Sequence, residues 1–415
     1  MSRKWVFAYF MVACLTLIAG CWSRAELTDL AIVSAFAFDK DEEGQYVGTF
    51  QIINPGNVPG ALQGGASGQN PTVTTYSTTG TNPDELSSQA SAKISRRLYY
   101  AHTNLLVISE ELARDEGLSV ILDSLERGLE FRTTARVVIA RNTHAGDLVK
   151  VLTSIDQVPA EKVIKTLEST EKHYGSSITT NLQELVKSLV STGKEPLVGG
   201  FTIVGNAKKG SSIDSLKSTG HSAVPEANGI ALFKEGKLVN WLDGTKARGA
   251  MWILDRIKQT TVSIDWGNRK DAIAFQVIRQ KADVSAHMKD GQPMISVGIR
   301  TEGDLRSVNV PVDLINPHVL LEIEKSLEQG IKKEIEEAIS EAKVNKTDVF
   351  GFGEKLYQSK PHVWKALEQN WHDVSFPKLD IEVNVEAFIR RTGVRNNPYL
   401  FETEKSKEYR REGSE

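Results

Sequence analysis

The chain has 415 residues, enough for two or three domains of ordinary size. Hydrophobic residues make up 40% of it and charged residues 25%, which excludes collagen, a wholly disordered chain and a polytopic membrane protein. The formal net charge of −3 provides no basic field that would attract a polyanion, so we expect no nucleic-acid partner.

Residues 1–20 have the composition of a signal peptide. A short positive region, Arg3 and Lys4, is followed by fifteen uncharged residues, fewer than the ~20 that a membrane-spanning helix needs. Small residues directly precede Cys21, which resembles the bacterial lipobox, in which the cysteine is linked to diacylglycerol and becomes the new N-terminus. We therefore predict that residues 1–20 are removed and that Cys21 is lipidated. The alternatives are an ordinary signal peptide and an uncleaved signal anchor.

The two cysteines then have separate fates. Cys14 leaves with the signal peptide and Cys21 carries lipid, so the mature chain has no free thiol and no disulfide. Each buried CH₂ group contributes ~0.8 kcal/mol to membrane binding, so two or three acyl chains anchor a protein firmly. We expect a lipid-anchored protein outside the membrane.

Residues 21–205 predict a mixed α/β region, organised as two subdomains. Strand-forming and helix-forming segments alternate along it, a pattern typical of α/β folds. The expected strands cover 27–38, 46–53, 72–79, 102–109, 136–140 and 196–204, and the expected helices cover 82–98, 110–128, 145–152, 160–173 and 181–190.

The second half predicts an α+β domain at residues 227–393, after a Ser/Gly-rich linker at 206–226. It opens with a hairpin around residues 234–236, and the runs between 260 and 310 alternate apolar and polar residues, which favours an antiparallel sheet with one wet side. An amphipathic helix at 317–343 is expected to cross this sheet. The expected end is a second helix at 360–371, a strand at 379–389 and a disordered tail at 394–415.

Motifs for catalysis and metal binding are missing. The sequence contains no HExxH, CxxC, P-loop or Gly-x-Ser-x-Gly, and its histidines are scattered, so we predict no cofactor, no metal site and no enzyme activity. Glu334, Glu336 and Glu337 are interpreted as a solvated helix face, although a carboxylate pair that meets only in space stays open. The tryptophans of the second half are interpreted as core residues, with an interface or an aromatic ligand platform as the alternative; they are Trp241, Trp252, Trp266, Trp364 and Trp371.

The segment that follows the signal peptide reads Cys21-Trp22-Ser23-Arg24-Ala25-Glu26-Leu27 and leads into an apolar run that ends at Asp39. This junction resembles the Ger(x)C family of spore germination lipoproteins. Members begin with Cys-Trp-Asp-x-x-Glu-Leu and run into a hydrophobic strand that ends in Asp; here Ser23 replaces the Asp. Further similarity covers nearly the whole chain. It includes Arg97-Leu98, His102 to Ile108, Leu112-Ala113-Arg114, Leu122-Asp123, Arg127, Gly229, Phe233, Gly236-Lys237-Leu238, Arg248-Gly249, Trp364, Trp371 and Phe376-Pro377.

This resemblance implies a non-enzymatic C subunit of a nutrient germinant receptor. Such subunits consist of three packed domains and are anchored on the outer face of the spore inner membrane, where they assemble with the A and B membrane subunits. The resemblance assigns a definite role only to Cys21. Trp22, Arg24 and Glu26 are candidate interface residues because they lie next to the anchor, with a plain structural cap as the alternative. Which germinant is sensed, and whether this subunit contacts it, stay open.

Two other functions are compatible with a lipid-anchored chain of this kind. A solute-binding lipoprotein of a transporter would have two similar α/β lobes around a cleft, whereas the two halves here differ in their predicted class. A tethered cell-wall hydrolase would need catalytic carboxylates that no motif in the sequence identifies.

Overall fold

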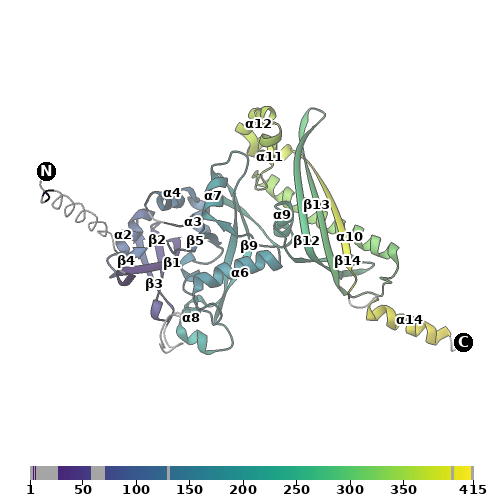
Figure 1. Cartoon of the computed structure of the whole chain (residues 1–415), viewed down its shortest axis with the longest axis horizontal. Helices are drawn as coiled ribbons and strands as arrows, with labels where there is room; N and C mark the ends of the chain where they lie inside the picture. The colour runs from purple at the N-terminus through teal and green to yellow at the C-terminus, as the bar shows by residue number, and fades with distance from the viewer. Residues whose placement is uncertain are drawn as a thin grey trace.

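We describe a computed structural model of the chain over residues 27–57, 71–128, 131–393 and 397–412, together with Arg3 and Trp5. Two β-sheets organise this part of the protein, and each forms a lobe with its own helices (Figure 1). The predicted combination of a mixed α/β half and an α+β half is confirmed.

The first lobe is built on one large sheet. Among the described residues its strands are β1 (Leu30–Lys40), β2 (Tyr46–Ile53), β3 (Val73–Gly80), β4 (Arg97–Tyr99), β5 (Leu105–Ser109), β6 (Arg136–Ala140), β7 (Thr180–Asn181), β8 (Leu197–Gly205), β9 (Ala223–Lys234) and β10 (Lys237–Leu242). The main order is β10-β9-β8-β6-β5-β1-β2-β3, with β4 beside β1 and β7 beside β6. The four central strands run parallel, while β2, β3, β9 and β10 extend the sheet antiparallel on both sides.

Both faces of the central strands are buried, which explains their nearly continuous apolar sequences. In β1, Phe36 and Phe38 lie in one core while Ala35 and Ala37 lie in the other, because successive side chains of a strand point to opposite faces. The large aromatic side chains therefore fill one layer, and the small ones allow helices to approach closely on the other.

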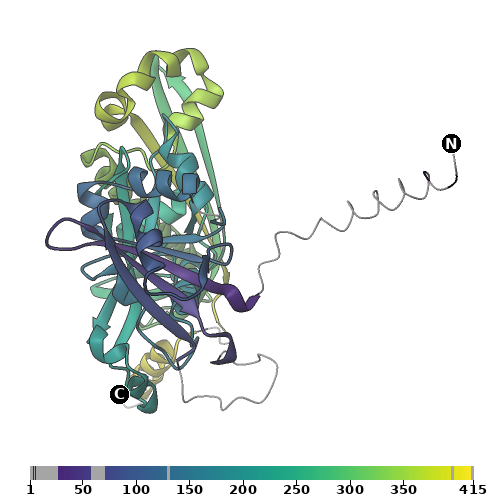
Figure 2. The same ribbon diagram turned by 90° about the vertical axis from the view of Figure 1, so that its left-hand side faces the viewer.

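Helices cover both faces of this sheet. One face carries α2 (Pro83–Ala90), α3 (Glu110–Asp115), α4 (Ser119–Gly128) and α7 (Leu182–Leu189), and the other carries α5 (Ala145–Leu148) and α6 (Pro159–His173). Short 3-10 turns occur at Leu27–Asp29 and Pro55–Asn57. Figure 2 views the molecule from the side of this lobe.

Three predicted helices of the first half are shorter than expected, and the one predicted for 145–152 ends at Leu148. The helix predicted for 82–98 ends at Ala90, since residues 97–99 form β4 beside β1. The helix predicted for 110–128 is divided at Gly117, whose φ of +85° is not helical, and the amide N–H of Leu118 donates to the carbonyl of Gly236 instead. Tertiary pairing therefore overrides helix propensity in the segments 82–98 and 110–128.

The predicted linker differs from the structure. Residues 206–226 contain α8 (Ala207–Gly210), a 3-10 turn (Ile213–Lys217) and the beginning of β9, which pairs with β8. The hairpin β9–β10 was expected to open the C-terminal domain; in the structure it extends the first sheet, because β8 offers an edge with which β9 pairs. The chain passes to the second lobe only after β10, through α9 (Gly244–Ile253).

The second sheet has the order β11-β12-β13-β14 within the described ranges. Its strands are β11 (Thr260–Trp266), β12 (Arg269–Lys289), β13 (Gln292–Val308) and β14 (Asp380–Arg391). The first three are antiparallel as predicted, but β14 runs parallel to β13, so a purely antiparallel sheet was wrong. The reason is the connection: a helical crossover returns the chain to the end at which β13 began.

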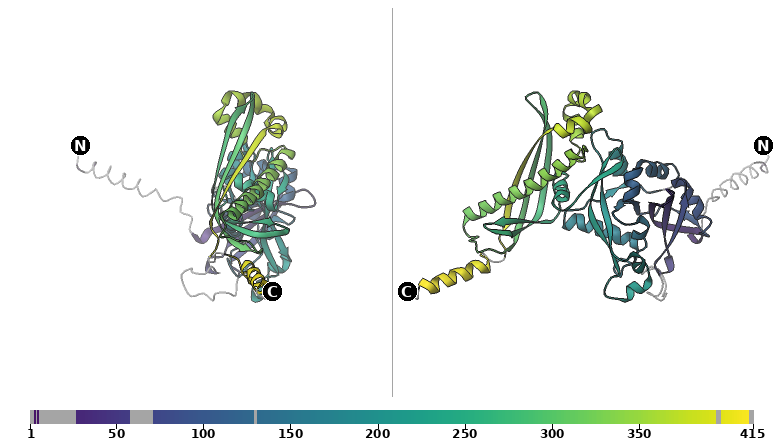
Figure 3. Two further views of the ribbon diagram at one scale, coloured as in Figure 1. Left: turned by 90° about the vertical axis from the view of Figure 1, so that its right-hand side faces the viewer. Right: turned by 180° about the vertical axis from the view of Figure 1, so that it is seen from behind.

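That crossover begins with the predicted long helix. Helix α10 (Pro317–Val344) lies across the second sheet (Figure 3) and is followed by α11 (Phe352–Ser359), α12 (Pro361–Leu367), a 3-10 turn (Glu368–Asn370), a π-helical turn (Trp371–Ser375) and α13 (Phe376–Lys378). The core beneath α10 continues through α9 to Leu197, Ile230 and Leu232 of the first sheet. A shared hydrophobic core therefore joins the two lobes.

The predicted disordered tail is wrong for most of its length. Residues Tyr399–Glu412 form α14, which projects from the far end of the second lobe (Figure 1). Glu, Lys and Arg dominate this segment and are good helix formers, so its polarity is compatible with an exposed helix. Asn397, just before α14, accepts a hydrogen bond of 2.8 Å from the amide of Leu314.

Candidate functional site at the junction of the lobes

The junction between the lobes brings together segments that are far apart in the sequence. It contains α7 and the loop before β8 from the first lobe, the turn between β9 and β10, the segment after α9, and the helices that follow α10.

Asp348 organises the segment between α10 and α11. Its fully buried carboxylate accepts the amide N–H of Gly353 at 2.8 Å and of Gly351 at 3.0 Å, and the indole N–H of Trp371 at 3.0 Å. Burial raises the pKa of Asp348 to about 6, although these N–H donors favour the charged form. The carboxylate thereby fixes the start of α11 and seats Trp371 against the ring of Trp364, 5.2 Å away.

Glu195 is a second buried carboxylate and lies on the first-lobe side of the junction. Its side chain accepts the amide N–H of Glu235 at 3.0 Å, and its own amide donates to the carbonyl of Asp348 at 2.8 Å. Burial raises the pKa of Glu195 to about 7. Three segments of the chain thus meet at this residue: the loop before β8, the β9–β10 turn and the loop before α11.

His372 completes this polar contact. Its Nδ1 accepts the amide N–H of Asp348 at 3.1 Å, which places the ring proton of the neutral form on Nε2, 3.9 Å from Oε1 of Glu195. Burial lowers the pKa of His372. At the surface of the same contact, Lys234 forms an ion pair of 2.6 Å with Asp373.

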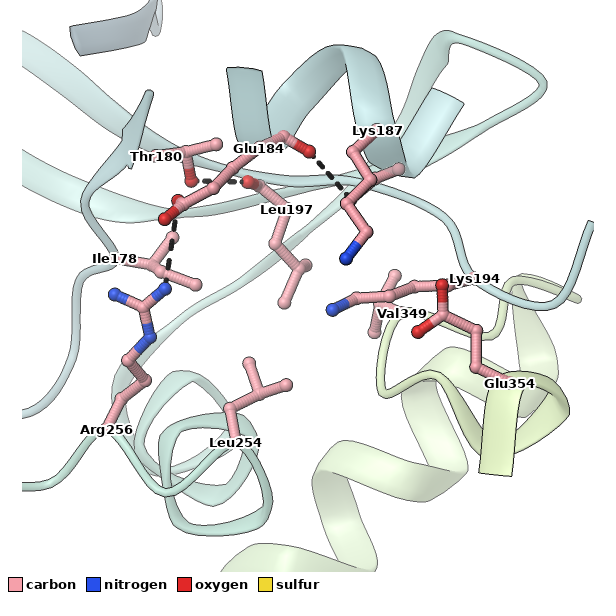
Figure 4. A pocket seen from close by; sticks show the side chains of 11 residues that line it. Ile178, Thr180, Glu184, Lys187, Lys194, Leu197, Leu254, Arg256, Val349 and Glu354 are labelled. Atoms are coloured by element: carbon pink, nitrogen blue, oxygen red, sulfur yellow. Dashed lines mark hydrogen bonds and ion pairs between the residues drawn. The ribbon is translucent and has the colours of Figure 1, made fainter. Parts of the chain in front are cut away.

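A cavity of about 270 Å³ lies beside these groups, between α7, β8, the segment after α9 and α11 (Figure 4). Its apolar wall consists of Ile178, Leu197, Leu254 and Val349. Its charged residues come from both lobes: Glu184, Lys187 and Lys194 from the first, and Arg256 and Glu354 from the second.

The charged residues of this cavity are unequally paired. Arg256 lies 3.2 Å from Glu171 and 3.7 Å from Glu184, and Glu354 accepts a hydrogen bond of 3.0 Å from the hydroxyl of Ser191. Lys187 and Lys194 point into the cavity in Figure 4, and no carboxylate of the described residues lies within ion-pair distance of either. Lys187 is exposed and Lys194 is partly exposed, so both ammonium groups stay in contact with solvent. Val349 has no exposed surface, and the apolar surface beside the lysines is small.

These groups form a binding arrangement more readily than a catalytic one. Glu195 and His372 are engaged by backbone groups, and neither lines the cavity. Over the described ranges, no cluster of three or more His, Cys, Asp or Glu side chains could hold a metal ion.

The site residues predicted from the sequence lie outside the described residues. This holds for Cys21, Trp22, Arg24 and Glu26, whose predicted roles remain predictions. The interpretation of Glu334 as a solvated residue is wrong: only 7% of it is exposed, and it pairs with Arg248. Glu336 and Glu337 do face solvent, each near a lysine one turn earlier.

The tryptophans are core residues, as predicted. Trp252, Trp371 and Trp364 are buried in the core that joins the lobes, against which Trp266 also packs. Trp241 is buried in the core of the first lobe. Sequence reasoning missed Lys187, Lys194, Glu195 and Asp348 as junction residues, since their local sequences carry no motif. The one usable signal was the run Asp348 to Gly353, in which glycines and aromatic residues follow an acidic residue.

The comparisons with known proteins cover almost the whole chain. Residues 23–203 match the family described as spore germination protein N-terminal domain, and residues 228–393 match the one described as spore germination B3/GerAC like, C-terminal. This chain belongs to the Ger(x)C family. The Ger(x)C chain is 43% identical over 399 residues to spore germination protein KC of Bacillus subtilis, a match that covers 96% of this chain and 98% of the relative.

More distant relatives also match this chain over most of its length. The putative spore germination protein YfkR of Bacillus subtilis is 26% identical, over 90% of this Ger(x)C chain and 92% of its own. The crystal structure of the GerBC protein has the same fold, with a TM-score of 0.55 at 17% identity, covering 86% of this chain and 96% of that one. No helix in the described part of this Ger(x)C protein is both long and apolar enough to span a membrane.

Proposed function

We propose that this protein is the non-enzymatic C subunit of a nutrient germinant receptor, held on the outer face of the spore inner membrane by lipid on Cys21. The observation that carries the proposal is the 43% identity to a spore germination protein over 96% of the chain. Full-length similarity favours a shared role because both lobes and their junction are covered together. The partners in this proposal are the A and B membrane subunits.

The chain geometry supports an anchor close to the first lobe. Cys21 precedes Leu27 by six residues, which can span at most about 20 Å. The 3-10 turn at Leu27–Asp29 leads directly into β1, which is an inner strand of the large sheet. A lipid on Cys21 would therefore hold the first lobe near the bilayer, and Trp22, Arg24 and Glu26 would lie within reach of a membrane subunit.

The anchor is tested by Cys21→Ala in spores, with Cys14→Ala as the matched control. We expect Cys21→Ala to lose the protein from the membrane fraction and to reduce the response to one nutrient, because no acyl chain is attached. Cys14→Ala should leave both unchanged, since this residue is removed with the signal peptide. Full membrane retention and an unchanged nutrient response in Cys21→Ala would contradict the anchor.

The receptor role needs a separate experiment. Affinity purification of this protein from detergent-solubilised spore membranes should recover an A and a B subunit, and deletion of its gene should abolish the response to the same nutrient. Normal germination of the deletion strain with every nutrient that the parent senses would contradict the role.

A further inference from the structure

Strand β14 forms one edge of the second sheet, because it ends the order β11-β12-β13-β14. Alternate residues of a strand direct their backbone N–H and C=O groups to opposite sides, so only every second residue of β14 bonds to β13. The amides of Ala387 and Ile389 donate to side chains of α10 and not to β13, so the odd-numbered residues face the open edge. These include Ile381, Val383 and Val385. The left view of Figure 3 shows β14 beside α10, on the side of the second lobe that is turned away from the first.

Charged side chains of α10 cover the two ends of this edge. Glu328 and Glu324 accept the two amides just named, at 3.2 and 2.8 Å. At the other end, Nζ of Lys343 donates to the carbonyl of Leu379 at 2.6 Å. Such side chains prevent pairing with another strand wherever they occupy the backbone groups.

The backbone between these two ends is open. Within the described part of the chain, the edge-facing groups of Ile381, Val383 and Val385 have no hydrogen-bond partner. Lys332 and Glu336 follow Glu328 along α10 at intervals of one turn, but they pair with each other at 3.8 Å. An edge with unpaired N–H and C=O groups can accept an additional strand.

The exposed face of β14 defines the charge of that strand. Glu382 and Glu386 are exposed on either side of Asn384, and neither has an ion pair with a described residue. Arg300 of β13 is in register with Glu386, but its guanidinium lies 4.7 Å from the ring of Phe388. An added strand would bring its own side chains to about 5 Å from these carboxylates, where a basic residue is favourable and an acidic one is not.

The opposite face of β14 defines the remaining positions. Ile381 and Val385 are partly exposed there, whereas Val383 is buried. Aliphatic side chains on the added strand would cover this apolar surface. A second copy of β14 fits poorly, because an antiparallel pair centred on this segment would place carboxylates opposite one another.

We propose that the edge of β14 at residues 381–385 pairs with an extended segment of a partner protein in which lysine or arginine alternates with aliphatic residues. Backbone hydrogen bonds supply the pairing, the basic side chains lie beside Glu382 and Glu386, and the aliphatic ones cover Ile381 and Val385. The side chains of α10 limit the pairing to this short segment. This inference does not depend on the proposed receptor role.

The probe is the fluorescein-labelled peptide Lys-Val-Lys-Val-Lys-Val-Lys, and fluorescence anisotropy with the full-length protein in detergent measures its binding. We expect saturable binding, and binding at least tenfold weaker for the peptide with glutamate in place of lysine. Two further peptides carry N-methyl groups on all lysines or on all valines. Only one of these two sets of amides faces β14, so one peptide should lose binding and the other should keep it.

Variants locate the site. Glu382→Lys/Glu386→Lys should weaken binding of the lysine peptide about tenfold or more and allow the glutamate peptide to bind. Glu402→Lys/Glu404→Lys makes the same change of net charge on exposed residues of α14 and should leave both affinities unchanged.

Val385→Pro should abolish binding, because it removes a donor on the open edge and no bond to β13. Circular dichroism establishes that each variant is folded. The two charge variants change only exposed residues, so they test the site even if Val385→Pro does not fold.

Three results would overturn the assignment. They are the absence of saturable binding of the lysine peptide, equal binding of the two methylated peptides, and unchanged affinity in Glu382→Lys/Glu386→Lys. Sedimentation of the wild type as a dimer that Val385→Pro dissociates would also overturn it, because the edge would then bind a second copy. None of these results bears on the Cys21→Ala experiment, so the two proposals fail separately.

Discussion

Arg248 and Glu334 form an ion pair inside the contact between α9 and α10. Nε of Arg248 lies 2.8 Å from Oε2 of Glu334, Nη2 contacts Oε1, and the indole N–H of Trp252 donates to the same carboxylate at 3.1 Å. Nη1 of Arg248 also donates to the carbonyl of Thr261 at 3.0 Å, so each nitrogen of the guanidinium has a protein acceptor. Such a pair contributes little net stability, but the loss of one partner leaves a buried charge without compensation.

Removal of the arginine alone should therefore be costly. We expect Arg248→Met to lower the free energy of unfolding by about 3–5 kcal/mol, and the double variant Arg248→Met/Glu334→Leu to recover much of this loss. Denaturant unfolding followed by tryptophan fluorescence measures both. The matched control is Lys333→Met, because Lys333 on the same helix is exposed and lies 4.0 Å from the partly exposed Glu337; its effect should stay within about 0.5 kcal/mol. A double variant no more stable than Arg248→Met would contradict this account.

At the scale of elements, α9 and α10 approach closely at a glycine. A Cβ at Gly249 would collide with the backbone carbonyl of Glu334 and approach the Cβ of Ala338 to 2.9 Å. Backbone atoms cannot move aside as a flexible side chain can, so this position excludes larger residues. The contact lies where the shared core passes from the first sheet to the second.

Alanine substitutions at two glycines of this helix pair should have opposite effects. Gly249→Ala should destabilise the protein by about 2 kcal/mol or more, because α9 must move away from α10. Gly330→Ala in α10 should stabilise it by up to about 1 kcal/mol, since the new Cβ meets only Ile264 at an ordinary 3.6 Å. Thermal unfolding of both variants measures the difference. Equal effects of the two substitutions would show that close packing at Gly249 is unimportant.

The same two elements show how far sequence reasoning reaches. The apolar period of 317–343 predicted α10 to within one residue, because the side that packs on the sheet is encoded locally. Burial of Glu334 could not be predicted in this way, since its partner Arg248 lies 86 residues away. The direction of β14 and the placement of β9–β10 likewise depend on long-range pairing, as do the lysines of the cavity.

At the scale of the whole molecule, the junction couples the lobes through apolar and polar contacts together. The shared core includes Leu197 and Ile230 of the first sheet as well as Val349 and Phe352 near α11. Beside it, Glu195, His372 and Asp348 connect the backbones of the two sides. Because burial raises the pKa of Glu195 to about 7, this contact changes its charge near neutral pH.

The stability of the molecule should consequently depend on pH through Glu195. Its native pKa of about 7 exceeds the ordinary value of 4.5, so the native state binds more protons between these values and stability falls as pH rises through this range. Glu195→Gln keeps the acceptor for the Glu235 amide but cannot ionise. Relative to the wild type, we expect the variant to gain on the order of 2 kcal/mol between about pH 5 and pH 8.

Denaturant unfolding of the variant and the wild type across this pH range tests the expectation. Two other groups change the stability over the same range: the raised pKa of Asp348 lowers stability as pH rises, and the lowered pKa of His372 increases it. Both groups are present in the two proteins, so the difference between the two pH profiles reports mainly on Glu195. Lys234 and Glu235 also face Glu195 and stay unchanged in the comparison. Glu336→Gln, on the exposed side of α10, should follow the wild-type pH profile. Parallel pH profiles for the wild type and Glu195→Gln would mean that Glu195 stays ionised at the junction. The protonation of Glu195 would then contribute nothing to stability, and the apolar core alone would hold the lobes together.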